Sequence, residues 1–240
     1  MPLPKINTPT YELEIPSTGK KIKYRPFLVR EEKILLMALE SEDLKQITNS
    51  LIQILNDCII TRGVKVQNLA TFDIEYLFLN VRTKSVGEIV EVNVVCNDDN
   101  ETTVDVEIEI DSIKVQKNKN HKNIIKLDDT YSMKLKYPSF DQFVDNNFEV
   151  SQDVSDVNQS LNMIISCIEM VYDKEESWSA ADCSKKELTE FVDQLNSKQF
   201  KQIESFFTTM PKLSHTVTVT NPNTGNECNV PLEGLAAFFS

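Results

Sequence analysis

The spacing of apolar residues changes twice along this 240-residue chain, and that change limits the folds available to it. Over residues 44–60 the apolar side chains recur at steps of three or four, typical of a buried helix: Leu44, Ile47, Leu51, Leu55 and Cys58. Over residues 104–110 valine and isoleucine alternate with acidic residues, which is typical of a half-buried strand. Helical spacing then returns after residue 155. The chain is therefore expected to belong to the α+β class.

The N-terminal third combines a hairpin with helices. Apolar–polar alternation over residues 11–15 and 22–24 flanks turn residues 16–19, which predicts a β-hairpin with glutamates facing lysines. Three helices are expected to follow, at about residues 28–41, 44–60 and 71–84, with Thr71 as the N-cap of the third.

The middle of the chain has the two-residue period of strands. Strands are predicted over residues 89–95 and 104–110, and a third over 133–137 after the polar loop 117–123. The third strand has a lysine face, so it can lie beside the acidic strand.

The last third is mainly helical. One helix is expected to begin at Ser155 and to carry its apolar stripe to Val171. A capping box at Ser184–Glu187 begins a second helix, and a third runs from Ser197 to Pro211. Two strands, through Val217 and Cys228, close the chain around a turn at 221–225.

The expected architecture is two helical blocks flanking a small antiparallel sheet, with N-terminal and C-terminal β-hairpins. Its segments are residues 1–85 (hairpin plus helices), 86–137 (antiparallel β region) and 138–240 (helices plus terminal hairpin). No composition shift marks a linker, so the three are expected to form one compact unit.

The charge balance argues against nucleic acid as a partner. With 37 acidic and 25 basic residues, the net charge of −12 repels phosphates. A DNA mimic is the sharper alternative, but the acidic residues are scattered. No apolar run reaches the roughly 20 residues of a membrane span, and no apolar signal core follows Met1. These features favour a cytoplasmic protein.

The cysteines indicate a reduced protein without a metal. They are five and widely spaced, at Cys58, Cys96, Cys167, Cys183 and Cys228. Zinc ribbons need two ligands in each hairpin turn, whereas Cys96 and Cys228 are single, even with His215 nearby. The sequence therefore predicts no metal and no cofactor, and a small metal-ribbon protein is kept as the alternative of another class.

No catalytic arrangement stands out. His121 lies in the polar loop, where a solvated side chain is expected, and His215 opens the penultimate strand. Neither belongs to a nucleophile motif, and the chain has no phosphate-binding glycine loop. The pairs Asp98–Asp99 and Asp128–Asp129 have the character of turn residues. The chain is expected not to be an enzyme.

Four apolar side chains are candidates for contact with a partner protein: Trp178, Leu235, Phe238 and Phe239. Aromatic residues dominate interface hot spots, but the same side chains can pack in the protein's own core.

The order of several short segments resembles the baseplate protein family of T4-like tailed bacteriophages. They are Thr8–Leu13, Pro16–Gly19, Tyr24–Val29, Glu31–Lys33, Leu188–Phe191, Phe206–Phe207, Met210–Leu213, Leu232–Leu235 and Phe238–Phe239. The family includes a baseplate hub subunit and a hub assembly protein, so the resemblance implies contacts with other phage baseplate hub proteins. It implies assembly in the host cytoplasm and a place in the virion tail; the alternative is a transient, chaperone-like assembly factor absent from the virion. The family's terminal hairpin can carry a cysteine knuckle, which Asn221–Gly225 lacks.

Overall fold

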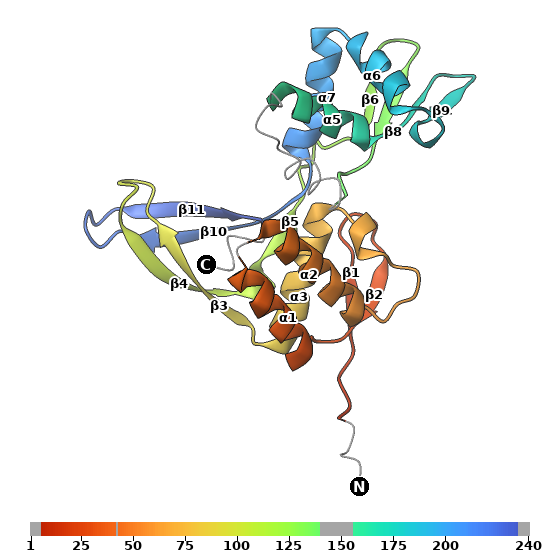
Figure 1. Ribbon diagram of the computed structural model, residues 1–240. Coiled ribbons are helices and arrows are strands. Elements are labelled where there is room, and N and C mark those ends of the chain that lie inside the picture. Colours follow the sequence, from red (N-terminus) through yellow and green to blue (C-terminus); the bar gives the residue numbers. More distant parts are fainter. Residues whose placement is uncertain (1–5, 42, 140–155, 235–240) are drawn as a thin grey trace. The chain divides into compact units, whose positions relative to one another are not determined.

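The computed structural model of the protein describes residues 6–41, 43–139 and 156–234. The described residues form six α-helices and four small antiparallel sheets, which confirms the α+β class (Figure 1). The strands are thus spread over several sheets instead of one.

Contacts divide the chain into two compact units. Unit 1 comprises the residues up to Gln116 and those from Lys212 onward, and unit 2 comprises Lys117–Pro211. A strand near Gln116 pairs with one that begins at Lys212, which joins the two parts of unit 1. The division into segments 1–85, 86–137 and 138–240 stays a prediction.

The described residues of unit 1 form three α-helices, two short 3-10 helices and seven strands. In chain order they are β1 (Tyr11–Glu14), β2 (Lys21–Tyr24), α1 (Val29–Glu40), α2 (Leu44–Cys58), η1 (Val66–Asn68), α3 (Thr71–Ser85), β3 (Ile89–Val95), β4 (Thr103–Glu109), η2 (Ile110–Ser112), β5 (Lys114–Gln116), β10 (Lys212–Thr220) and β11 (Glu227–Glu233). The predicted hairpins form as β1–β2, β3–β4 and β10–β11, and β5 adds to the free edge of β10.

The two long hairpins of unit 1 share one apolar core. Alternate side chains of β3 and β4 pack with those of β10 and β11, together with Leu79 of α3. Figure 1 shows the two hairpins side by side with their turns at the same end. The strict two-residue period of the sequence correctly predicts that one face of each hairpin is buried.

The start of α1 contains a buried carboxylate. Glu31 is 1% exposed; it accepts hydrogen bonds from the Leu28 backbone N–H at 2.7 Å and from the guanidinium groups of Arg25 (2.9 Å) and Arg30 (2.6 Å). Burial by itself raises the pKa of Glu31, but these three donors outweigh it and lower the pKa to about 2.

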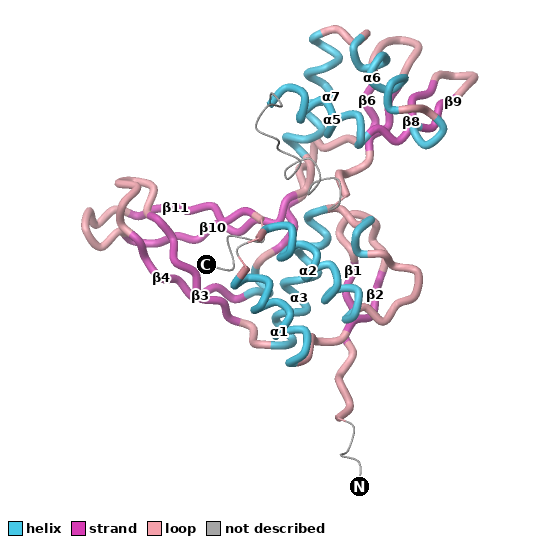
Figure 2. The backbone as a smooth tube through the Cα atoms, in the orientation of Figure 1, coloured by secondary structure: helices cyan, strands magenta, loops and turns pink. Residues whose placement is uncertain are grey.

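Unit 2 is a four-stranded sheet packed against helices. Its elements are β6 (Ile124–Lys126), β7 (Ser132–Leu135), α5 (Asp156–Cys167), β8 (Ile168–Tyr172), β9 (Ser177–Ser179), η3 (Ala180–Asp182), α6 (Lys185–Asp193) and α7 (Ser197–Thr209). The sheet order is β6-β7-β8-β9. Figure 2 shows the strands of this unit in magenta and its helices in cyan. Apolar side chains of α5, α6 and α7 join the core of the sheet. The predicted capping box at Ser184 and Glu187 is present.

Three local predictions were wrong. The helix expected to continue to Val171 ends at Cys167, because Ile168–Tyr172 pairs with strands on both sides and is rich in residues that favour strands. The strand at residues 132–135 lies beside β6 and β8, not beside the acidic strand β4, which pairs with β3. Ala70 and not Thr71 is the N-cap of α3.

Candidate functional site

The turns of the two long hairpins bring three potential metal ligands together. Ligand atoms of Cys96, Asp98 and Cys228 lie within 4.8 Å of one another, with both thiols buried and Asp98 exposed. Cys96 directly follows β3, and Cys228 lies near the start of β11. His215 is opposite Leu232 in the β10–β11 ladder and is not part of this group. The sequence placed the two cysteines on similar hairpins, but it did not indicate that the turns meet.

Hydrogen bonds from the β10–β11 hairpin converge on Asp98. Its Oδ1 accepts from the Asn221 side-chain amide at 2.7 Å and from the Cys228 thiol at 3.3 Å. Its Oδ2 accepts from the Thr224 hydroxyl and from the Asn226 amide at 3.3 Å. The Thr224 and Asn221 donors, with smaller contributions from the others, hold the pKa of Asp98 well below its usual range.

Asp99 is equally well supplied with donors. Its Oδ1 accepts from the backbone N–H groups of Glu101 (3.1 Å) and Thr102 (3.0 Å). Its Oδ2 accepts from the Thr102 hydroxyl and from Asn221 Nδ2 at 2.9 Å. These bonds, led by the Thr102 hydroxyl, lower the pKa of Asp99 as well. Each of the four carboxylate oxygens therefore accepts two hydrogen bonds.

The candidate metal group has features that work against metal binding. It offers three ligands where a structural zinc site uses four. Burial raises the pKa of the Cys228 thiol, and its bond to Asp98 requires the proton that a metal would displace.

Trp178 lies at an exposed edge of unit 2. In the sheet register Ile125, Met133, Val171 and Trp178 form one row across the strands. The first three are buried, whereas Trp178 on the edge strand β9 is 41% exposed. Its ring lies 6.2 Å from that of Tyr131, which is 39% exposed. We call this pair, Tyr131 and Trp178, the aromatic edge. The other predicted contact residues, Leu235, Phe238 and Phe239, lie outside the described residues.

His121 is packed against rings, contrary to the solvated position expected for it. Its ring stacks on Tyr137 at 5.5 Å and lies 5.0 Å from the ring of Phe206. Its Nδ1 is 3.0 Å from the Thr209 hydroxyl, which itself donates to the Ser205 carbonyl, so Nδ1 is the donor. Burial lowers the pKa of His121, which favours the neutral ring. The Phe206 ring explains the error, since it comes from a distant part of the sequence.

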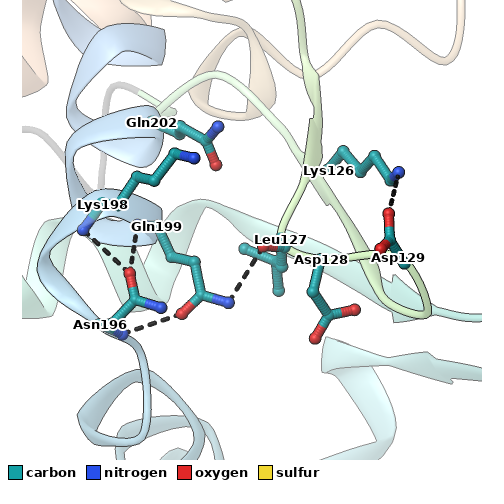
Figure 3. Close-up of a pocket in the computed structure, with 8 residues that line it drawn as sticks. All are labelled: Lys126, Leu127, Asp128, Asp129, Asn196, Lys198, Gln199 and Gln202. Carbon is teal, nitrogen blue, oxygen red and sulfur yellow. Dashed lines mark hydrogen bonds and ion pairs between the residues drawn. The ribbon is translucent and has the colours of Figure 1, made fainter.

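A polar pocket of unit 2 lies between the β6–β7 turn and the start of α7 (Figure 3). The Gln199 amide donates to the Leu127 carbonyl at 3.0 Å, and its oxygen accepts from the Asn196 backbone at 2.9 Å. Lys126 pairs with Asp129 at 2.8 Å. No histidine, cysteine or hydroxyl side chain lines this pocket, so its polar groups serve to cap the helix and close the turn.

The outer face of the β3–β4 hairpin is acidic. Glu91 and Glu107 are directly opposite in the register, and Glu109 faces Ile89. Like charges at opposite positions destabilise a strand pair. Asn93 bonds to Asp105 on the same face at 2.7 Å.

Comparison with known proteins gives one match at the level of families. Residues 8–240 match the family described as T4 bacteriophage base plate protein. Comparisons with curated proteins and with solved structures gave no significant match. Within the described part of the chain, none of the helices combines the length and the apolar character that crossing a membrane requires.

Proposed function

Because this chain belongs to the T4 bacteriophage base plate protein family, we propose that it takes part in building the central hub of a tailed-phage baseplate. The match over nearly the whole chain is the observation that carries this proposal, and it establishes a phage baseplate protein of structural type. We propose the hub as its location and other hub proteins as its partners. On this proposal the chain is assembled in the host cytoplasm and acts through protein–protein contacts.

The aromatic edge supports a role in contacts. A tryptophan that ends a row of buried side chains has its position fixed by the sheet, while 41% of its surface stays available. Such a ring adds apolar contact area at little entropic cost, which is typical of hot-spot residues. We propose that Trp178 contacts a neighbouring hub protein, together with the predicted residues Leu235, Phe238 and Phe239.

This contact is tested by co-purification from infected cells. Trp178→Ala is expected to reduce recovery of the partner protein at least tenfold, since a hot-spot ring contributes about 2 kcal/mol or more. Trp178→Phe keeps an aromatic ring and should retain most of the recovery. Ile60→Ala, at an exposed isoleucine of unit 1, is the matched control. Unchanged recovery with folded Trp178→Ala would remove Trp178 from the proposal.

A transient assembly factor is the second candidate function. It needs the same kind of partner-binding surface, so the two candidates differ in when the protein is present. Mass spectrometry of purified virions separates them. A hub subunit is found in mature particles at fixed stoichiometry, whereas an assembly factor is found only with hub intermediates.

A further inference from the structure

The turns of the two long hairpins share two backbone features, although the β3–β4 turn is one residue longer: the Cys96 N–H bonds to the Thr102 carbonyl, and the Asn221 N–H bonds to the Asn226 carbonyl. In the β3–β4 turn the Asn100 N–H donates to the Cys96 carbonyl at 2.9 Å, and Asn100 has a φ of 58°. In the β10–β11 turn the Gly225 N–H donates to the Asn221 carbonyl at 2.8 Å, and Gly225 has a φ of 74°. Each turn thus closes four residues after its start, at a left-handed residue of a type that tolerates this conformation.

Two facing turns of this kind are the framework of a zinc ribbon. In each turn of a zinc ribbon, two ligands are separated by two intervening residues. Counting from the first residue of each turn, the equivalent positions are Cys96 and Asp99 in one turn, and Asn221 and Thr224 in the other. Only one of the four is a thiol. Cys228, the other thiol of the group, lies on the returning strand and outside the turn.

Asn221 links the two turns. Its Oδ1 accepts from the N–H groups of Asn223 at 2.8 Å and Thr224 at 3.3 Å within its own turn. Its Nδ2 donates across to Asp98 at 2.7 Å and Asp99 at 2.9 Å. The side chain is 0% exposed, and both acceptor sites and both donors of the amide are used. A buried polar group bonded this fully stabilises one arrangement of its neighbours.

Further bonds between the turns add to this link. The Thr224 hydroxyl donates to Asp98, and the Asn223 amide donates to the Thr102 hydroxyl at 2.9 Å. The Asn97 amide donates to the Asn229 carbonyl at 3.1 Å.

We propose that the paired turns are a metal-free counterpart of a zinc ribbon, in which the Asn221 amide and the carboxylates of Asp98 and Asp99 join the hairpins in place of an ion. The backbone of the site retains the ligand spacing for zinc, while the side chains supply a hydrogen-bond network. Three substitutions are then sufficient to turn the network into a four-thiolate site.

Metal analysis of the full-length protein tests this proposal. After incubation with Zn²⁺ and desalting, the natural protein is expected to retain no stoichiometric zinc. The variant Asp99→Cys/Asn221→Cys/Thr224→Cys, refolded with Zn²⁺, is expected to retain about one ion per chain, and its Co²⁺ form should show the absorption of tetrahedral thiolate coordination. The matched variant with serine at the same three positions should retain none.

Two outcomes of the metal experiment overturn the proposal. Stoichiometric zinc in the natural protein, lost on Cys96→Ser or Cys228→Ser, would make the cluster a metal site. A folded three-cysteine variant that retains no zinc would show that the turns do not have ribbon geometry.

A second measurement does not depend on refolding the three-cysteine variant. Asn221→Ala removes the donor that Asp98 and Asp99 share, so amide hydrogen exchange in residues 96–102 is expected to accelerate about tenfold or more, the factor that follows from losing hydrogen bonds to charged groups. Asn93→Ala removes a bond within one hairpin and should leave that turn unchanged. Equal exchange in Asn221→Ala and the natural protein would contradict the proposal.

Discussion

Glu31 is a single residue on which the start of α1 depends. Its carboxylate is buried with Arg25, whose side chain is only 14% exposed. Glu31→Gln removes the negative charge and leaves the guanidinium of Arg25 without an ionic partner. We expect the free energy of unfolding to fall by about 3 kcal/mol, as when one member of a buried ion pair is removed. Denaturant unfolding measures the loss, and Glu32→Gln at the exposed neighbouring glutamate is the control.

The same residue gives the protein a pH dependence of defined sign. Because the pKa of Glu31 is lowered to about 2 on folding, its contribution is present above its unfolded pKa of about 4.3 and is lost as the pH falls toward 2. The natural protein should therefore lose stability across this window, and Glu31→Gln should lose less. Equal slopes of unfolding free energy against pH for the two proteins would contradict the assignment.

Asp98 predicts a second acid effect, located in the hairpin turns. Its pKa is also lowered on folding, so its stabilisation is present above about pH 4 and declines in more acidic solution. We expect the rate of amide exchange in residues 221–228, corrected for its intrinsic dependence on pH, to rise in acidic solution. Asp98→Asn should show the fast rate already at neutral pH. Glu101→Gln, an exposed acid of the same turn, should behave like the natural protein.

At the residue scale, the sequence indicated which residues are notable but not which residues they contact. It singled out Cys96, Cys228 and Trp178, and it described Asp98–Asp99 as turn residues. It gave no sign that Asn221 reaches these carboxylates, because that contact joins positions 122 or more residues apart. His121 was misjudged for the same reason, since Phe206 and Thr209 are remote from it in the chain.

At the scale of elements, the β3–β4 hairpin tolerates an unfavourable pair. Glu91 and Glu107 are opposite each other on the exposed face. Glu91→Lys converts this pair to an attractive one, and the free energy of unfolding should rise by a few tenths of a kcal/mol. Asn93→Lys, which introduces the same charge next to Asp105, also removes an existing bond and should gain less. Thermal melting at low salt measures both, and a lower melting temperature for Glu91→Lys would contradict this account.

The elements themselves were largely predictable where local signals agree. Hairpins with strict alternation and the helix with the Ser184 capping box were found from the sequence, because period, turn and cap favour the same structure. β8 was missed, since the apolar spacing of Ile164, Ile168 and Val171 also fits a helix. Its strand form depends on pairing with β7 and β9, and β9 is only three residues long.

At the scale of the whole molecule, the chain leaves unit 1 and re-enters it at neighbouring positions. Gln116 of β5 and Lys212 of β10 are partners in one antiparallel ladder. Their Cα atoms are therefore close enough for a two-residue Asn-Gly turn to connect them. No local pattern in the sequence marks this insertion, because it rests on three residue pairs between strands almost a hundred residues apart.

This topology predicts that unit 1 folds by itself. A protein in which Asn-Gly replaces residues 117–211 should keep the β10–β11 and β3–β4 hairpins and unfold cooperatively, because the apolar cluster that these hairpins share contains no described residue of the deleted part. Circular dichroism and the dispersion of amide NMR signals check this. A larger deletion of residues 103–211, which also removes β4 and β5, should not fold. An unfolded spectrum for the first protein would contradict the prediction.

An inserted unit whose two ends meet at one rung of a ladder is a self-contained cassette. A change in the length or sequence of such a unit leaves the strand register of unit 1 unaltered. Insertions and deletions in related sequences are therefore expected to lie between Gln116 and Lys212, while the hairpins of unit 1 keep their length.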